Sequence, residues 1–329
     1  MKLKFGIIGT GWITEAYVDG ALDSGLWSLT AIYSRTKEKG LEFGKKYQVD
    51  NVYTDLSEMA ASKDINAVYI ASPNYLHVRH AAEFLRSGKH VICEKPLASH
   101  AHEVEALQKL AEENHVVYLE AIMFMHLPAR RLLEDALQKI GRVSMAKFDF
   151  CQRSSKYDAY LQGQLPNIFN PEMETGALMD LGIYCIYPAL YLFGKPESFD
   201  ISVTMLPSGV DGNGAVTLKY PDKLVYIPYS KIGQAGADSD IQGDRGTLSI
   251  ASISKLGYMK ITYSGGETEV VCDEEPKYKL MGYEAKDFHL YITEPENEEY
   301  RRCSELSLSV TGLLEELRYK AGIQFPSDQ

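Results

Sequence analysis

The chain has 329 residues, of which 45% are hydrophobic and 24% charged, as in an ordinary globular protein of about two domains. Its 34 basic and 45 acidic side chains give a formal net charge of -11, which disfavours nucleic acid and anionic membrane surfaces as partners. The five cysteines are widely spread and form no C-x-x-C pair, so we expect neither a disulfide framework nor structural zinc.

The N-terminal segment superficially resembles a signal peptide, because Lys2 and Lys4 precede an apolar run. Gly9, Gly11 and Glu15 interrupt that run too early for a signal peptide. No apolar stretch approaches the roughly 20 residues that span a bilayer. We therefore expect a first strand here, no membrane association and a cytoplasmic location.

The first part of the chain alternates apolar strand signals with amphipathic helical segments, the pattern of a parallel sheet with covering helices. The expected strands are residues 4–8, 29–33, 68–71, 90–93 and 116–119. The expected helices are residues 12–23, 36–47, 76–87 and 100–114. The sequence therefore predicts an N-terminal doubly wound Rossmann domain over residues 1–122.

The pattern changes after residue 122, where short strands bounded by Gly, Pro, Asp or Ser dominate. We expect helices at 128–139 and 177–193, a loop-like segment at 154–175, and strands at 143–150, 201–205, 215–220, 224–228, 247–250 and 259–263. This predicts an α+β domain over 123–329 with a largely antiparallel sheet. A leucine stripe over 303–320 predicts a final helix that packs back, or alternatively an oligomer contact.

A glycine turn joins the first strand to the first helix. Two glycines at this point let the backbone approach a pyrophosphate, whose charge the helix amides then bind. Thr14 occupies the third glycine position and weakens the fingerprint, so a tight turn without a ligand is the alternative. The cofactor-binding candidates in this turn are Gly9, Thr10, Gly11, Trp12 and Ile13.

The end of the second strand reads Tyr33-Ser34-Arg35-Thr36, where an NAD-specific site would offer an acid to the ribose hydroxyls. A serine and an arginine suit a 2′-phosphate instead, since guanidinium groups match phosphate geometry. We therefore expect NADP as the preferred cofactor, with NAD possible, and Ser34, Arg35 and Lys39 as its contacts. The alternative is that the basic residues form a solvated helix face.

Polar groups also follow the third and fourth predicted strands. The residues in these two segments that we expect to line the cofactor crevice are Ser72, Pro73, Asn74, His77, Glu94 and Lys95. Lys95 lies where an open α/β sheet binds ligands, and Pro96 restricts the backbone beside it. His77 and His80 have a spacing compatible with one metal, but no third ligand is indicated and we expect no metal site.

Asp180 and Tyr184 are four residues apart on a predicted helix, which places both side chains on one face. Tyrosine can exchange a proton if a nearby ammonium lowers its free pKa of about 10, and Lys95 is the candidate for that ammonium. The expected reaction is hydride transfer between a carbinol carbon and nicotinamide, with Tyr184 moving the hydroxyl proton. The alternative is that Tyr184 belongs to a packing set with Tyr187 and Tyr191.

These residues together resemble the Gfo/Idh/MocA family of oxidoreductases over essentially the whole chain. The resemblance includes the glycine turn, the Ala71-Ser72-Pro73-Asn74 segment with His77, Glu94-Lys95-Pro96, and residues 176–184. Most members carry histidine at the position of Tyr184. A branch containing dimeric dihydrodiol dehydrogenase and NADP-dependent xylose dehydrogenase carries tyrosine, and this chain resembles that branch.

The resemblance implies that Lys95 and Tyr184 are catalytic, that Asp180 supports them, and that the substrate is a sugar, polyol or cyclic diol. It also implies a homodimer or homotetramer formed through the open face of the second-domain sheet. Residues 123–126 depart from the branch pattern, so its substrate contacts cannot be carried over. A non-catalytic NADP-binding redox sensor, and a lyase or hydrolase that uses bound cofactor transiently, are the competing readings.

Overall fold

The computed structural model describes residues 2–273 and 275–328, and its internal contacts divide the chain into two compact units. The first unit comprises Met1–His126 and Pro276–Thr311, and the second comprises Leu127–Glu275 and Gly312–Gln329. The sequence pattern predicted that the first domain ends at residue 122 and that all of 123–329 belongs to the second. It did not anticipate that Pro276–Thr311 joins the first unit.

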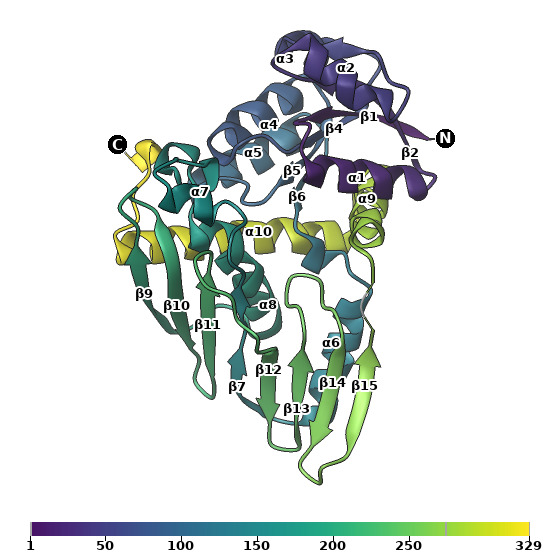
Figure 1. Ribbon diagram of the computed structural model, residues 1–329. Helices are drawn as coiled ribbons and strands as arrows, with labels where there is room; N and C mark the ends of the chain where they lie inside the picture. The colour runs from purple at the N-terminus through teal and green to yellow at the C-terminus, as the bar shows by residue number, and fades with distance from the viewer. Residues whose placement is uncertain (1, 274, 329) are drawn as a thin grey trace. The chain divides into compact units, whose positions relative to one another are not determined.

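The first unit contains one parallel sheet of order β3-β2-β1-β4-β5-β6 (Figure 1). Its strand order reverses between β1 and β4, and the crevice beyond the carboxyl ends at such a point binds ligands in doubly wound folds. The predicted Rossmann sheet is confirmed. The strands are β1 (Leu3–Ile8), β2 (Trp27–Tyr33), β3 (Val52–Tyr53), β4 (Ala67–Ile70), β5 (His90–Glu94) and β6 (Tyr118–Ala121).

Helices follow the strands of the first unit in alternation, as predicted, although β3 and the helix over residues 56–61 were not foreseen. They are α1 (Trp12–Asp23), α2 (Lys37–Lys45), α3 (Leu56–Ala61), η1 (Asn74–Leu76), α4 (His77–Arg86), α5 (Ala101–Glu113), η2 (Met123–Met125), α9 (Lys277–Thr293) and the first part of α10 (Glu298–Ala321). The sequence analysis missed α9, which packs on α1. A Cβ atom on Gly20 would lie 2.6 Å from the Gly282 nitrogen, so the backbones of these two helices are in contact. Glycines add no apolar side chains to the helical pattern, and this is why the sequence did not predict the helix.

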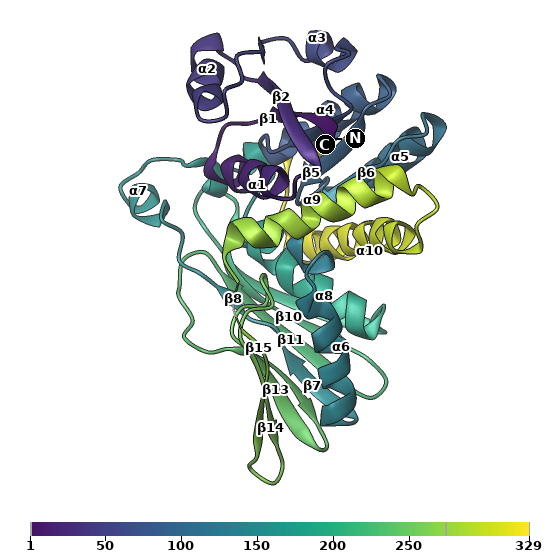
Figure 2. The same cartoon turned by 90° about the vertical axis from the view of Figure 1, so that its right-hand side faces the viewer.

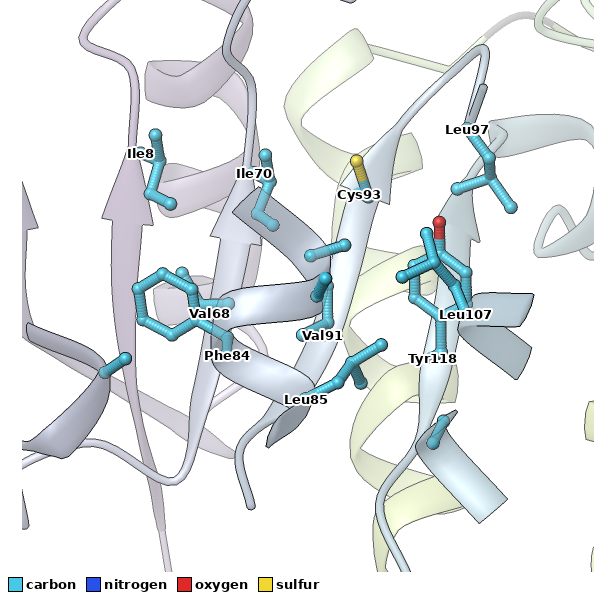
Figure 3. Packing of buried hydrophobic residues seen from close by; sticks show 14 of the residues in the cluster. Ile8, Val68, Ile70, Phe84, Leu85, Val91, Cys93, Leu97, Leu107 and Tyr118 are labelled. Carbon is cyan, nitrogen blue, oxygen red and sulfur yellow. The ribbon is translucent and has the colours of Figure 1, made fainter. Parts of the chain in front are cut away.

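One hydrophobic cluster of the first unit lies between this sheet and the helices on one of its faces (Figure 3). Ile8, Ile70 and Cys93 extend from three neighbouring strands, and Phe84 and Leu85 of α4 pack against them. All five are at most 2% exposed. Strands that are buried on both faces have continuous apolar sequences, and this is why the sequence alone predicted them.

The second unit is built on a mixed, mostly antiparallel sheet of order β15-β14-β13-β12-β7-β11-β10-β9, with β8 paired to β11. Only β7 and β8 run parallel to their neighbour β11 in the described ladders. The predicted fold class is confirmed, although β12 and β15 were not foreseen. The strands are β7 (Val143–Lys147), β8 (Phe150–Cys151), β9 (Ser198–Met205), β10 (Asp211–Lys219), β11 (Leu224–Ser230), β12 (Ser239–Gly243), β13 (Gly246–Ile250), β14 (Met259–Tyr263) and β15 (Thr268–Cys272).

Helices α6 and α8 cover one face of this sheet (Figure 2). Val225 and Ile227 face them and are fully buried, whereas Leu224 and Tyr226 on the other face are 40% and 43% exposed. The segment expected to be loop-like contains a short helix and two turns. The helical elements are α6 (Ala129–Ile140), α7 (Tyr157–Leu161), η3 (Asn167–Phe169), η4 (Pro171–Met173), η5 (Leu178–Gly182), α8 (Ile183–Phe193), the end of α10 and η6 (Pro326–Asp328).

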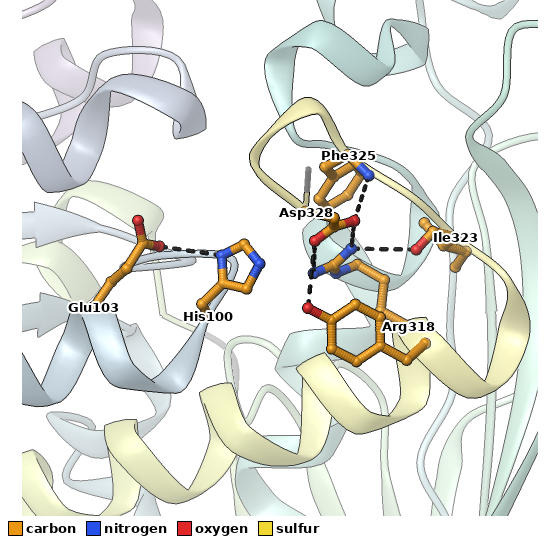
Figure 4. Close-up of polar contacts among 7 residues, drawn as sticks. His100, Glu103, Arg318, Ile323, Phe325 and Asp328 are labelled. Atoms are coloured by element: carbon orange, nitrogen blue, oxygen red, sulfur yellow. Dashed lines mark hydrogen bonds and ion pairs between the residues drawn. The ribbon is translucent and has the colours of Figure 1, made fainter.

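A buried ion pair holds the chain end within the second unit (Figure 4). The Arg318 side chain is 0% exposed, and its two terminal nitrogens donate to the carboxylate of Asp328 at 2.5 and 2.7 Å. Arg318 also donates to the Ile323 carbonyl at 3.2 Å and lies over the Phe325 ring. A buried guanidinium needs such a bidentate partner, because removing either charge leaves the other one desolvated.

One helical stretch, Pro171–Phe193, is long and apolar enough to cross a membrane by length and composition alone, with a mean hydropathy of 1.4. This corrects the expectation that no stretch would be apolar enough. In the structure 72% of the segment's window is buried. Its apolar side chains are therefore accounted for by packing inside the second unit.

Candidate active site

Gly9 ends β1 in a conformation that other residues rarely adopt. Its φ is +103°, and a Cβ atom there would lie 2.6 Å from the carbonyl oxygen of Ala71, just after β4. Gly11 is the N-cap of α1 and makes no side-chain capping bond. The turn therefore combines a close backbone approach with the amino end of a helix, the arrangement that binds a pyrophosphate.

A pocket of about 560 Å³ opens beside this turn in the first unit. It brings together predicted cofactor residues from the ends of three strands, namely Gly9, Thr10, Ser34, Arg35, Lys39, Ser72 and Pro73. Its remaining lining residues were not predicted and are Ile8, Tyr33, Thr36, Ala71, Tyr75, Leu76 and His80. The predicted residues Gly11, Trp12, Ile13, Asn74, His77, Glu94 and Lys95 are not part of this lining.

The polar lining of the pocket suits an anion. Arg35 and Lys39 supply positive charge, Ser34 supplies a hydroxyl, and no described lining residue is an aspartate or glutamate. The volume lies within the range of small-molecule and cofactor sites. The residues present therefore fit a phosphorylated dinucleotide, and a ribose hydroxyl would meet no carboxylate of this lining.

His77 lies behind the pocket and is 1% exposed. Its Nδ1 is 2.8 Å from the Pro96 carbonyl oxygen, and its Nε2 is 2.8 Å from the Ser72 carbonyl oxygen. The ring thus joins the loop after β4 to the loop after β5. This places His77 as a residue that supports the pocket wall rather than one that lines it.

Glu94 ends β5 and is held by a buried tyrosine that the sequence analysis missed. The Tyr69 hydroxyl donates to Glu94 Oε1 at 2.6 Å, and the Tyr69 ring stacks on Tyr17 with centroids 3.9 Å apart. Burial, followed by the nearby Glu94 carboxylate, raises the pKa of Tyr69 well above its usual range. Tyr69 therefore stays protonated and holds Glu94, the residue before Lys95.

The 123–126 segment packs in the first unit. Met123, Phe124 and Met125 are at most 6% exposed, and His126 Nδ1 lies 2.9 Å from Asp287 Oδ2. These residues do not line the pocket described above.

In the second unit, Asp180 and Tyr184 lie on one continuous helical stretch, as predicted. Asp180 falls in the π-helical turn η5, a rare element that is frequent at functional sites. Lys231, one residue after β11 and only 9% exposed, forms an ion pair with Asp180. Tyr184 meets the edge of Phe150 with ring centroids 5.5 Å apart. No local sequence signal marked Lys231, because its partner is distant along the chain.

Asp211, at the start of β10, fixes the beginning of this stretch. Its Oδ2 accepts a hydrogen bond from the Leu178 backbone N–H at 2.7 Å, and the side chain is 1% exposed. Burial raises the pKa of Asp211 to about 7, against the lowering effect of hydrogen bonds from backbone N–H groups. The helix bearing Asp180 and Tyr184 therefore starts at a carboxyl group supplied by a distant strand.

The reversed parallel sheet, the glycine turn and the anion-compatible pocket define a dinucleotide-binding Rossmann domain, here joined to an α+β unit. The chain belongs to the Gfo/Idh/MocA family. Residues 3–121 match the model of the oxidoreductase family with NAD-binding Rossmann fold, and residues 126–249 match that of the GFO/IDH/MocA C-terminal domain. The protein is therefore an NAD(P)-binding oxidoreductase, which confirms the predicted family and enzyme class.

Three curated relatives span nearly the whole chain. Scyllo-inositol 2-dehydrogenase (NADP(+)) IolU of Bacillus subtilis is 42% identical over 99% of both chains. The uncharacterized oxidoreductase YgjR of Escherichia coli is 39% identical over 99% of this chain and 98% of its own length. Trans-1,2-dihydrobenzene-1,2-diol dehydrogenase of Danio rerio is 26% identical over 100% and 99% of the two chains.

Solved structures confirm the fold. The NADP and TDP-benzene complex of KijD10, a 3-ketoreductase from Actinomadura kijaniata, has a TM-score of 0.85 at 22% identity and covers 98% of both chains. Levoglucosan dehydrogenase with NADH and levoglucosan has a TM-score of 0.83 at 19% identity and the same coverage.

The raised pKa of Asp211 predicts a pH-dependent stability. A carboxyl with a folded-state pKa of about 7 stabilises the protein most at low pH, and this contribution is lost as pH rises from about 4 to about 7. Asp211→Asn keeps an acceptor for the Leu178 N–H without a titrating group. As pH rises over this range, we expect the free energy of unfolding of Asp211→Asn to increase relative to that of the wild type, by up to about 4 kcal/mol.

Thermal unfolding of both proteins across this pH range measures the effect. Asp211→Ala is the control and should be less stable at every pH, because the Leu178 N–H then loses its acceptor. Parallel pH profiles for wild type and Asp211→Asn would show that another group titrates.

The Tyr69–Glu94 hydrogen bond predicts unequal effects of two matched substitutions. Tyr69→Phe removes the hydroxyl that binds a carboxylate and should lower the free energy of unfolding by about 1.5–3 kcal/mol. Tyr17→Phe removes a hydroxyl from the stacked partner ring and should cost less than about 1 kcal/mol. Equal losses in denaturant unfolding would contradict a specific role for Tyr69.

Proposed function

We propose that this protein is an NADP-dependent dehydrogenase that oxidises a carbinol of a cyclic polyol, with an inositol as the first candidate. The observation that carries this proposal is the 42% identity over 99% of both chains to a relative named as an NADP-dependent scyllo-inositol dehydrogenase. The wider substrate class, from the sequence analysis, is a sugar, polyol or cyclic diol. Relatives named as dihydrodiol dehydrogenases support a vicinal diol as the shared feature.

The preference for NADP is supported by the pocket. The pocket is lined by Ser34, Arg35 and Lys39, and no aspartate or glutamate is among the lining residues that the structure describes. A 2′-phosphate there would meet positive charge and a hydroxyl group. An NAD-specific site instead needs an acid for the ribose hydroxyls.

We propose Tyr184 as the group that accepts the hydroxyl proton of the substrate at its phenolic oxygen. Lys95 would favour the phenolate electrostatically and bind the substrate oxygen, and Asp180, paired with Lys231, would hold the helix that carries Tyr184. Bound nicotinamide supplies the hydride acceptor. These roles rest on the family resemblance and on the chemistry of the side chains.

A cytoplasmic location also remains our proposal. All five cysteines are free thiols, which suits a reducing compartment.

The test is reduction of NADP or NAD on mixing purified protein with scyllo-inositol, other inositols, cyclic diols and aldoses. We expect NADP reduction with an inositol, and Tyr184→Phe should lower kcat/KM by roughly 10²–10⁴-fold with cofactor binding retained. Full activity in Tyr184→Phe would remove its assigned role. Cofactor binding without NADP or NAD reduction by any of these substrates would favour the redox sensor. Substrate consumption without net cofactor reduction would favour the transient-redox lyase or hydrolase.

We further propose that the protein forms a homodimer or homotetramer through the uncovered face of its second-unit sheet. Met145, Leu224 and Tyr226 are 40%, 40% and 43% exposed, and Leu224 lies directly opposite Met145 across neighbouring strands. Light scattering should give a multiple of the 36.8 kDa chain mass, and Leu224→Asp should reduce it. Leu132→Asp on α6 is the exposed-leucine control, and a monomeric wild type would refute the proposal.

A further inference from the structure

His80 of α4 presents an unused ring nitrogen at the wall of the first unit's pocket. The residue lines the pocket although it is only 5% exposed. Its Nδ1 lies 3.0 Å from Ser72 Oγ, and its ring meets the edge of Tyr33 with centroids 6.4 Å apart. Within residues 2–273 and 275–328, Nε2 has no hydrogen-bond partner. An imidazole nitrogen held without a protein partner in a pocket wall is a binding group for a ligand that fills the pocket.

The surroundings of His80 favour its neutral form. The pKa of His80 is lowered to about 4, first by burial and then by the charges of His77 and Arg79 on the same helix. A neutral ring whose Nδ1 accepts the Ser72 hydroxyl hydrogen carries its own hydrogen on Nε2. His80 can therefore donate a hydrogen bond toward the pocket.

We propose that His80 Nε2–H binds the 2′-phosphate of NADP, and that the ring takes up one proton from solvent when this phosphate arrives. This inference rests on the NADP preference proposed above. No described residue of the pocket lining is acidic, while Arg35 and Lys39 line the same space. A phosphate monoester is close to dianionic at neutral pH and stabilises an imidazolium at hydrogen-bond distance.

The adenine ring is the other part of the cofactor that a histidine could contact. Adenine offers neutral acceptors and a donor, which neither need the surrounding cations nor favour an imidazolium. The positive charge of the lining therefore favours the phosphate as the partner of His80. Comparing NADP with NAD separates a phosphate contact from an adenine contact, because only NADP carries the 2′-phosphate.

Calorimetric titration of the full chain with NADP, NAD and adenosine 2′,5′-bisphosphate tests the proposal. Repeating each titration in two buffers of different ionisation enthalpy gives the protons taken up on binding. We expect His80→Gln to weaken NADP and the bisphosphate about tenfold, to change NAD less than about twofold, and to lower the proton uptake. His90→Gln is the control, because His90 also has a pKa of about 4 but does not line the pocket.

The outcomes distinguish this inference from the function on which it rests. Equal weakening of NADP and NAD would indicate an adenine contact and overturn the proposal, as would unchanged affinity and proton uptake in His80→Gln. A wild type that binds NAD as tightly as NADP would refute the NADP preference. The bisphosphate titration would then still decide whether His80 contacts the phosphate.

Discussion

The close approach of the Gly9 backbone to the Ala71 carbonyl is the constraint on which the first unit's site depends. These residues follow β1 and β4, the two central strands between which the strand order reverses. Any side chain at Gly9 would push the two loops apart, because its Cβ would lie 2.6 Å from the Ala71 oxygen and φ is +103°. Adjacent loops at this distance form the floor of a pocket whose remaining walls come from the ends of β2 and the start of α4.

Buried polar side chains then fix the loops that the sheet alone leaves adjustable. The His77 ring spans two carbonyl oxygens, of Ser72 and Pro96, at 2.8 Å each. The Tyr69 hydroxyl donates a hydrogen bond to Glu94, the residue before Lys95. The positions after β4 and β5 are thus set by side chains that themselves do not line the pocket, and these residues support the geometry of the site.

The sequence predicted those features whose physical cause is local. The β1 turn, the continuous apolar strands and the helical stretch containing Asp180 and Tyr184 all follow from spacing within a few residues. Features set by distant contacts were missed. The helix α9 packs on α1 through Gly20 and Gly282, which add no apolar periodicity, and Lys231 pairs with a carboxylate far away in the chain.

The same contrast applies to charge in the second unit. Asp211, at the start of β10, was not singled out from the sequence, yet it is buried against the first turn of the helical stretch that carries Asp180 and Tyr184. A buried carboxyl there costs stability when ionised, as its raised pKa shows, but it anchors the backbone N–H of Leu178. Because Lys231 holds Asp180 from β11, two strands of one sheet fix the start of this helix from separate points. The start of the helical stretch that carries Tyr184 is therefore fixed by the sheet, through residues far from it in sequence.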